Sequence, residues 1–150
     1  MKRVNEYKKL FNVGSKIDLK ELKTTYRELI KEWHPDKFQD EALKEEAGLR
    51  SKTIIDGFHF LVSIAPDTKE ALKEEYERTT SDTGIIDFKH KGLVLEVSFA
   101  DGTTYEYFGV NKNLYGKFLN SDRQYRFAKR NIFHSFLYRK SKKDAVLEYD

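Results

Sequence analysis

The sequence predicts an α+β chain, in which an all-helical N-terminal domain precedes a smaller domain built on an antiparallel β-sheet. Apolar residues recur at helical spacing through the first half of the 150 residues. The composition then changes at TTSDTG (79–84), which reads as a linker, and beyond it the apolar period becomes two. We therefore assign residues 1–80 to the first domain and residues 81–150 to the second.

The first domain is expected to be an antiparallel helix hairpin with flanking helices. Asp18 is a good N-cap, and Glu21 completes an acidic variant of the capping box. Pro35 ends the helix that follows, because a proline disfavours helical backbone at the preceding residue. The expected helices span residues 4–11, 18–33, 40–64 and 67–79.

The second domain is expected to contain strands at about 85–110, helices at about 111–139 and a charged tail at 140–150. Asp101-Gly102 splits two alternating runs and is a strong hairpin signal. IIDFKH (85–90) reads as a preceding strand and 111–120 as a short helix. The segment 125–139 is apolar and basic, and it is expected to be helical or of mixed secondary structure.

Composition limits the classes of function. No apolar run reaches 18 residues, so we expect no membrane span and a cytoplasmic protein. The absence of cysteine excludes thiolate metal sites. The four histidines are scattered, and neither a phosphate-binding glycine loop nor a nucleophile elbow occurs, so we expect no metal, no cofactor and no enzymatic activity. We expect a monomer.

A basic stripe leads to an unusual corner, EWHPDKF (32–38). At 100° per residue, four basic side chains fall within an arc of about 80° on the helix before this corner. Such a stripe alone reads as a solvated face, but its junction with a His-Pro-Asp turn is more specific. The stripe consists of Lys20, Lys23, Arg27 and Lys31, and the corner of His34, Pro35 and Asp36.

The segment TYRELIKEWHPDKF resembles the second helix and loop of a J-domain, the module of DnaJ-type co-chaperones. YKKLFNV resembles that family's first helix, KTIIDGFHFL the end of the third and EEYER the fourth. The resemblance covers about the first 78 residues. It implies a DnaK-type chaperone as partner, whose ATP hydrolysis the HPD loop promotes and whose acidic surface receives the basic helix.

Carried over by position, the resemblance implies one set of docking residues. Lys31 extends the basic face by its spacing rather than by a motif match. Glu28 stands where family members often carry a second basic residue, and Gly57 replaces a usual alanine. The implied chaperone-binding residues are Lys20, Lys23, Tyr26, Arg27, Lys31, His34, Pro35 and Asp36.

The segment LVLEVSFADGTTYEYFGVNKNLYGKFLNSDRQYRF resembles the KTSC domain, over roughly residues 85–138. That family's function is poorly defined, with RNA binding as a suggestion. Residues 111–143 carry ten basic side chains and one acid, Asp122. The tyrosines could stack on bases or face a core, and the basic side chains could contact phosphates or water. The candidate nucleic-acid residues are Tyr105, Tyr107, Lys117, Arg123, Arg126, Lys129 and Arg130.

Three functions remain open from the sequence. The first is a co-chaperone whose second domain targets it or binds clients. The second is an RNA-binding adaptor in which the J-domain serves as a tether. The third is a structural interaction protein in which the HPD face is occluded.

Overall fold

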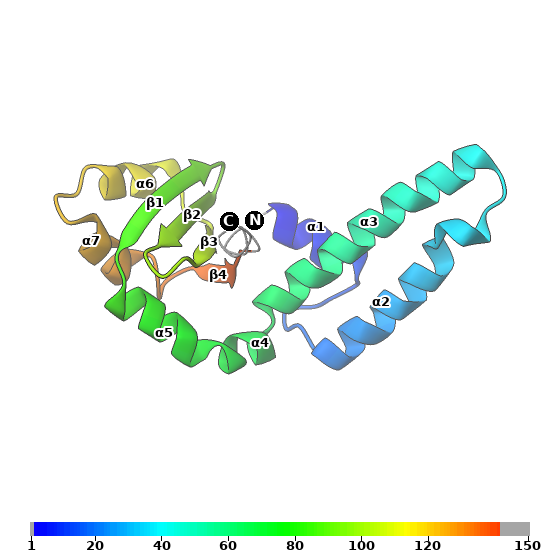
Figure 1. Ribbon diagram of the computed structural model, residues 1–150, viewed down its shortest axis with the longest axis horizontal. Helices are drawn as coiled ribbons and strands as arrows, with labels where there is room; N and C mark the ends of the chain where they lie inside the picture. Colours follow the sequence, from blue (N-terminus) through cyan, green and yellow to red (C-terminus); the bar gives the residue numbers. More distant parts are fainter. Residues whose placement is uncertain (1, 142–150) are drawn as a thin grey trace. The chain divides into compact units, whose positions relative to one another are not determined.

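The computed structural model describes residues 2–141 and divides into two compact units (Figure 1). The N-terminal unit spans Lys2–Glu70, and the C-terminal unit begins at Ala71. The division therefore falls ten residues before the expected boundary at 80/81. Most of the expected charged tail, residues 142–150, lies outside the described residues.

The N-terminal unit contains the expected helix hairpin. Helix α1 (Lys2–Leu10) packs on α3 (Glu41–Ile64), and α2 (Leu19–Trp33) runs beside α3 in the opposite direction (Figure 1). A short 3-10 turn, η1 (Pro35–Lys37), reverses the chain between them. Asp18 caps α2, because its carboxylate accepts hydrogen bonds from the backbone amides of Lys20 and Glu21.

Close packing of α1 on α3 depends on a glycine. A Cβ atom at Gly57 would lie 2.8 Å from Cδ1 of Tyr7 and 3.1 Å from Cε2 of Phe11. Gly57 therefore lets two aromatic rings approach the α3 backbone. Leu43 is exposed, so the buried face of α3 does not include it. Its buried residues are Ala47, Ser51, Ile54, Gly57, Phe60, Leu61 and Ile64.

The single charged helix expected at 67–79 is two helices, α4 (Pro66–Ala71) and α5 (Lys73–Asp82), separated at Leu72. The linker expected at 79–84 was wrong, because its first four residues form the last turn of α5. The Thr80 hydroxyl bonds back to the carbonyl of Tyr76, and the Thr83 hydroxyl bonds back to that of Thr79. In these bonds the threonine hydroxyls donate to backbone carbonyls one helical turn earlier. The composition of the segment, which is rich in Thr, Ser and Asp, is also typical of loops and does not indicate that such bonds form.

The C-terminal unit is a four-stranded antiparallel sheet in the order β1-β2-β3-β4. Its strands are β1 (Ile85–Lys91), β2 (Val94–Phe99), β3 (Thr104–Phe108) and β4 (Leu137–Lys140). The hairpin at Asp101-Gly102 is confirmed. Helices α6 (Lys112–Leu119) and α7 (Gln124–Asn131) precede β4, so the segment 125–139 is mixed: it starts in helix α7, passes through a turn at 132–136 and ends in strand β4.

The core of the C-terminal unit lies between one face of the sheet and the helices α5, α6 and α7. Leu95 pairs with Tyr107 and Val97 with Tyr105, and all four side chains are buried. Phe118, Ile132 and Phe133 close this core from α6 and from the segment after α7. Tyr76 of α5 belongs to the same cluster, which explains why the unit begins before residue 80.

Candidate functional site

The HPD corner is a 3-10 turn that His34 caps. Its Nδ1 accepts a hydrogen bond from the backbone amide of Asp36, at 3.2 Å. The carbonyls of His34 and Pro35 accept from the amides of Lys37 and Phe38, at 3.0 and 3.1 Å. Pro35 stands at the first position of the turn, where its missing amide hydrogen costs nothing. Backbone and side-chain bonds together therefore fix the corner.

Contacts from α3 hold the end of α2 that leads into the corner. The Ser51 hydroxyl donates to the carbonyl of Trp33 at 2.8 Å. Because Trp33 is the last residue of α2, its carbonyl has no hydrogen-bond donor within the helix, and Ser51 supplies one. The guanidinium of Arg50 lies 4.4 Å from the centre of the Trp33 ring. Phe38 stacks near the same ring, at 6.3 Å between centroids. These contacts connect the position of the corner to the body of the hairpin.

The functional groups of the corner face solvent. The side chain of His34 is 53% exposed and that of Asp36 is 85% exposed. His34 Nδ1 lies 3.6 Å from a carboxylate oxygen of Asp36, within reach of an ion pair only when the imidazole is protonated. At such exposure water screens the pair, so Asp36 is available to a cation of another molecule.

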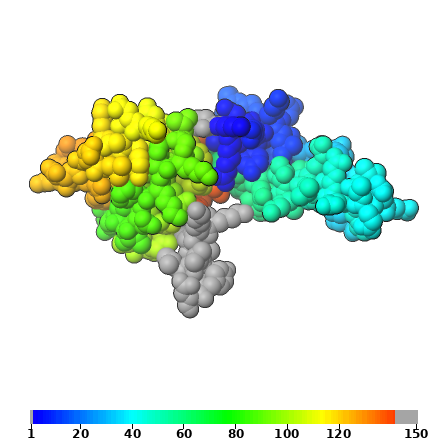
Figure 2. Space-filling model, turned by 90° about the horizontal axis from the view of Figure 1, so that it is seen from above, coloured from blue at the N-terminus to red at the C-terminus, as the bar shows by residue number. Residues whose placement is uncertain are grey.

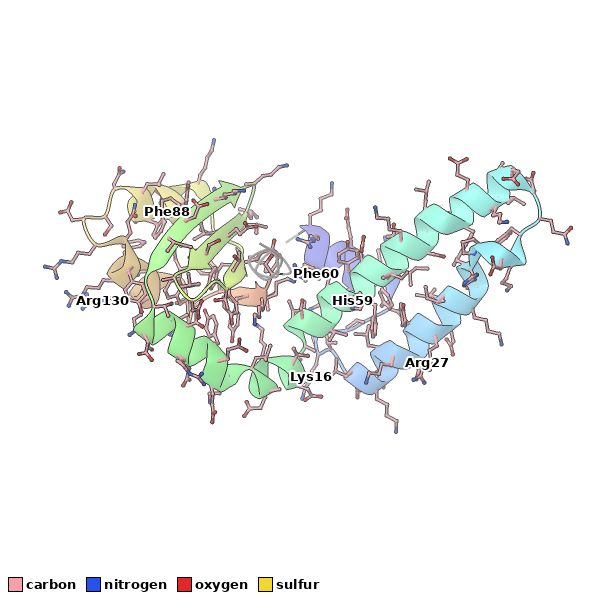
Figure 3. All side chains as sticks on the ribbon, viewed as in Figure 1. Lys16, Arg27, His59, Phe60, Phe88 and Arg130 are labelled. Atoms are coloured by element: carbon pink, nitrogen blue, oxygen red, sulfur yellow. The ribbon has the colours of Figure 1, made fainter. Side chains whose placement is uncertain are left out.

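The structure brings the basic stripe and the corner together on α2. Lys20, Lys23, Arg27 and Lys31 are all exposed. Arg27 extends from the side of α2 that is turned away from α3 (Figure 3). The ring of Tyr26 stacks on Phe58 of α3, at 4.1 Å between centroids, so it packs the hairpin beside the stripe. The four stripe residues, His34 and Asp36 are thus exposed on α2 and the turn that follows it, whereas Tyr26 and Pro35 are only partly exposed.

The tyrosines proposed for base stacking lie in the core. Tyr105 is 2% exposed and Tyr107 is 0% exposed. The Tyr107 hydroxyl lies 2.9 Å from that of Tyr76, which donates to the Phe133 carbonyl at 2.6 Å. Burial raises the pKa of both Tyr76 and Tyr107 above the usual tyrosine value. Tyr105 and Tyr107 therefore do not present a surface on which bases could stack. Of the two roles considered from the sequence, they have the second, as residues of the core.

The basic candidates of the C-terminal unit lie on its helices and are exposed. Lys117 belongs to α6, Lys129 to α7, and Arg123 is the N-cap residue of α7. Arg126 and Arg130 follow on α7, and Figure 3 shows Arg130 extending away from the sheet. Figure 2 shows the surface of α6 and α7, in yellow and orange.

Two features of these surfaces were missed from the sequence. Ser51, which anchors the corner, lies 18 positions from its partner, and no local pattern marks it. The buried pair of Arg139 with Glu106 lies on β4 and β3, and it could be found only once β4 was recognised as a strand. The signal for β4 was the apolar run Phe136–Leu137–Tyr138, which fits helix and strand equally.

Comparison with known proteins concerns the C-terminal unit. Residues 83–136 match the family model of the KTSC domain. No curated protein matches the chain. The match does not extend over α1, α2 and α3, so the J-domain resemblance rests on the quoted residues alone.

Two features are absent from residues 2–141. Among residues 2–141, no helix has the length and apolar character that crossing a membrane requires. In the same range, no group of three or more His, Asp or Glu side chains is arranged to hold a metal ion. The fold and the family match together identify the region 83–136 of the C-terminal unit as a KTSC domain.

Proposed function

We propose that the chain is a co-chaperone of the J-domain type, which docks on a DnaK-type ATPase through α2 and stimulates its ATP hydrolysis through the HPD corner. The C-terminal unit would then serve for targeting or for binding clients. The observation that carries the proposal is the turn at His34, Pro35 and Asp36, with its histidine and aspartate exposed, at the end of a helix that bears an exposed basic stripe.

Electrostatics and rigidity support this use of the corner. An exposed basic stripe attracts an acidic surface and raises the rate of encounter. Asp36 accepts hydrogen bonds only, so it suits an arginine of the partner, with which it would form a charge-assisted pair. Because Ser51 and the capped turn fix the corner, little conformational entropy is lost when the partner binds.

The proposal assigns no bond-making or bond-breaking chemistry to this chain. The corner would shift the conformational equilibrium of the ATPase by binding one of its states more tightly than another. The chain would therefore act as an activator and not as an enzyme. The support comes from α1, α2, α3 and the corner, because the segment that resembles a fourth J-domain helix lies in α5 of the C-terminal unit.

Steady-state ATP hydrolysis by a DnaK-type chaperone tests the proposal, with the full chain added at increasing concentration. The variants Asp36→Asn and His34→Gln are expected to abolish stimulation. Both should stay folded, since the two side chains are exposed and the glutamine retains an oxygen that can accept from the Asp36 amide.

Matched controls exist on α3. Asp56→Asn and His59→Gln make the same chemical changes at exposed positions away from the corner, and they should stimulate like the native chain. Native stimulation by Asp36→Asn, or no stimulation by the native chain, would refute the co-chaperone proposal.

A further inference from the structure

Three arginines, two on α7 and one at its N-cap, line a hollow in the surface of the C-terminal unit. The hollow has a volume of about 190 Å³. At 100° per residue, Arg126 and Arg130 lie about 40° apart, and both lie about 160° from the fully buried Ala128. Their guanidinium groups are therefore directed to solvent. The lining residues are Ser121, Arg123, Arg126, Phe127, Arg130 and Asn131.

This surface carries an excess of positive charge over the stretch from Lys112 to Asn131. Within the part of the chain that the structure describes, Arg123, Arg126 and Arg130 have no ion-pair partner. Asp122 is the one acidic side chain between Lys112 and Asn131, against six basic side chains. Like charges held this close repel one another, so a bound anion stabilises them. The basic residues of this stretch are Lys112, Lys117, Arg123, Arg126, Lys129 and Arg130.

The floor of the hollow is aromatic and polar rather than purely basic. Phe127 is half-buried, and its ring packs near Phe118 of the core, at 6.4 Å between centroids. The side-chain nitrogen of Asn131 donates to the Phe127 carbonyl at 2.9 Å, which orients the amide oxygen as an acceptor. The Ser121 oxygen accepts from the backbone amide of Arg123 at 3.2 Å, and its hydrogen can be donated elsewhere.

We propose that this hollow binds single-stranded nucleic acid, with the arginines on the phosphates and an unstacked base over Phe127. Arginine binds phosphate in a bidentate manner, and its planar group also stacks on bases. Arg123 and Arg130 are seven residues apart, about 10 Å along a helix, which exceeds the roughly 3.4 Å per phosphate along one strand of a duplex. The surface can thus contact more than one phosphate.

This site goes beyond the co-chaperone activity and is independent of it. It keeps Arg123, Arg126 and Arg130 from the nucleic-acid candidates of the sequence, and it leaves out Tyr105 and Tyr107, which are buried. An aromatic ring beside arginines favours a strand whose bases are exposed, because the bases of a duplex are stacked on one another. RNA and single-stranded DNA share this chemistry, so the probes below include both.

The test is fluorescence anisotropy with the full chain and labelled RNA and DNA oligonucleotides of the same sequence. The triple variant Arg123→Gln/Arg126→Gln/Arg130→Gln should weaken binding at least about tenfold. The slope of log affinity against log salt should fall by about 2, since each lost phosphate contact removes about 0.7 for a single strand. All three side chains are exposed, and circular dichroism would verify the fold.

The matched control removes three charges from the other unit. Lys20→Gln/Lys23→Gln/Arg27→Gln should bind the oligonucleotides like the native chain while losing stimulation of the ATPase. The α7 variant should show the reverse, so each proposal can fail alone. Three results would overturn the nucleic-acid site: no binding by the native chain, equal loss in both triple variants, or arginine-dependent binding of anionic lipid vesicles without binding of oligonucleotides.

Discussion

Tyr76 of α5 and Tyr107 of β3 hold their hydroxyl oxygens 2.9 Å apart inside the C-terminal unit. Tyr76 also stacks on Tyr138 of β4, with 3.9 Å between ring centroids and 9° between planes. Lys140 pairs with Glu75 at 2.9 Å, and the Thr79 hydroxyl donates to Asp101 at 2.7 Å. A helix outside the matched residues 83–136 is therefore built into the interior of that domain.

Tyr76→Phe should destabilise the C-terminal unit by about 2–3 kcal/mol, because it leaves the Tyr107 hydroxyl and the Phe133 carbonyl buried without a partner. Urea unfolding followed by near-ultraviolet circular dichroism measures the loss. Tyr107→Phe added to Tyr76→Phe should cost less than the sum of the two single changes, since no hydroxyl is then stranded. Strict additivity would contradict the shared hydrogen bond.

Alkaline pH should weaken the C-terminal unit. Burial raises the pKa of Tyr76 and Tyr107 in the folded state above the usual 10.0. The neutral tyrosines therefore contribute their full stability below pH 10, and this contribution is lost as pH rises further, where the unfolded chain releases protons that the folded chain keeps. Each tyrosine adds up to about 1.4 kcal/mol of loss per pH unit. Tyr76→Phe should reduce this slope in urea unfolding from neutral to alkaline pH, and an unchanged slope would argue against the burial.

Removing α5 should unfold the C-terminal unit. The fragment 71–150 retains Tyr76, Thr79 and Thr80, whereas the fragment 81–150 loses all three buried side chains. We expect a cooperative thermal transition and dispersed amide resonances from the longer fragment. We expect neither from the shorter one. A well-folded 81–150 fragment would show that α5 is dispensable.

Two glycines of α3 should respond in opposite directions to alanine. Gly57→Ala should destabilise the N-terminal unit by about 1–2 kcal/mol, because the added methyl meets the Tyr7 ring and overpacking outweighs the gain in helix propensity. Gly48→Ala should stabilise it by up to about 1 kcal/mol, since no atom lies within 4 Å of the added carbon. Trp33, the single tryptophan, reports both in fluorescence-detected unfolding. Equal effects at the two positions would contradict the close approach of α1.

Replacing Glu28 should strengthen docking if α2 binds an acidic surface. Glu28 is exposed and lies about 60° around the helix from Lys31. Glu28→Lys should therefore lower the concentration that half-maximally stimulates the ATPase at low salt. The difference should shrink as salt rises, because screening weakens surface charges. Glu45→Lys makes the same change on α3 and should have little effect, so an equal gain there would point to net charge alone.

The local signals in the sequence were sufficient for most elements. Asp18, Pro35 and the Asp101-Gly102 turn are chemical markers that act on adjacent backbone, and the helices and hairpin beside them are confirmed. The four stripe residues and the corner lie on one helix and its end, so their juxtaposition follows from helical spacing alone.

Tertiary contacts decided what the sequence could not. The extension of α5 to Asp82 accompanies the burial of Thr79 and Thr80 within the C-terminal unit, where the Tyr125 hydroxyl donates to the Thr80 carbonyl. Strand β4 is defined by its pairing with β3, whose residues lie 29 to 35 positions earlier in the chain. The hollow at α7 is lined by residues of the α6–α7 connection and of the helix itself. The spacing of residues in a sequence does not indicate where the surface is hollowed.

The placement of α5 also determines where this protein can be recombined. A hybrid protein in which the KTSC domain of this chain follows a different N-terminal module should be joined at Leu72, between α4 and α5. A hybrid joined at residue 83, where the family match begins, would contain the sheet without Tyr76, which belongs to its core. The transferable unit is therefore longer than the matched segment 83–136 by helix α5 at one end and by strand β4 at the other.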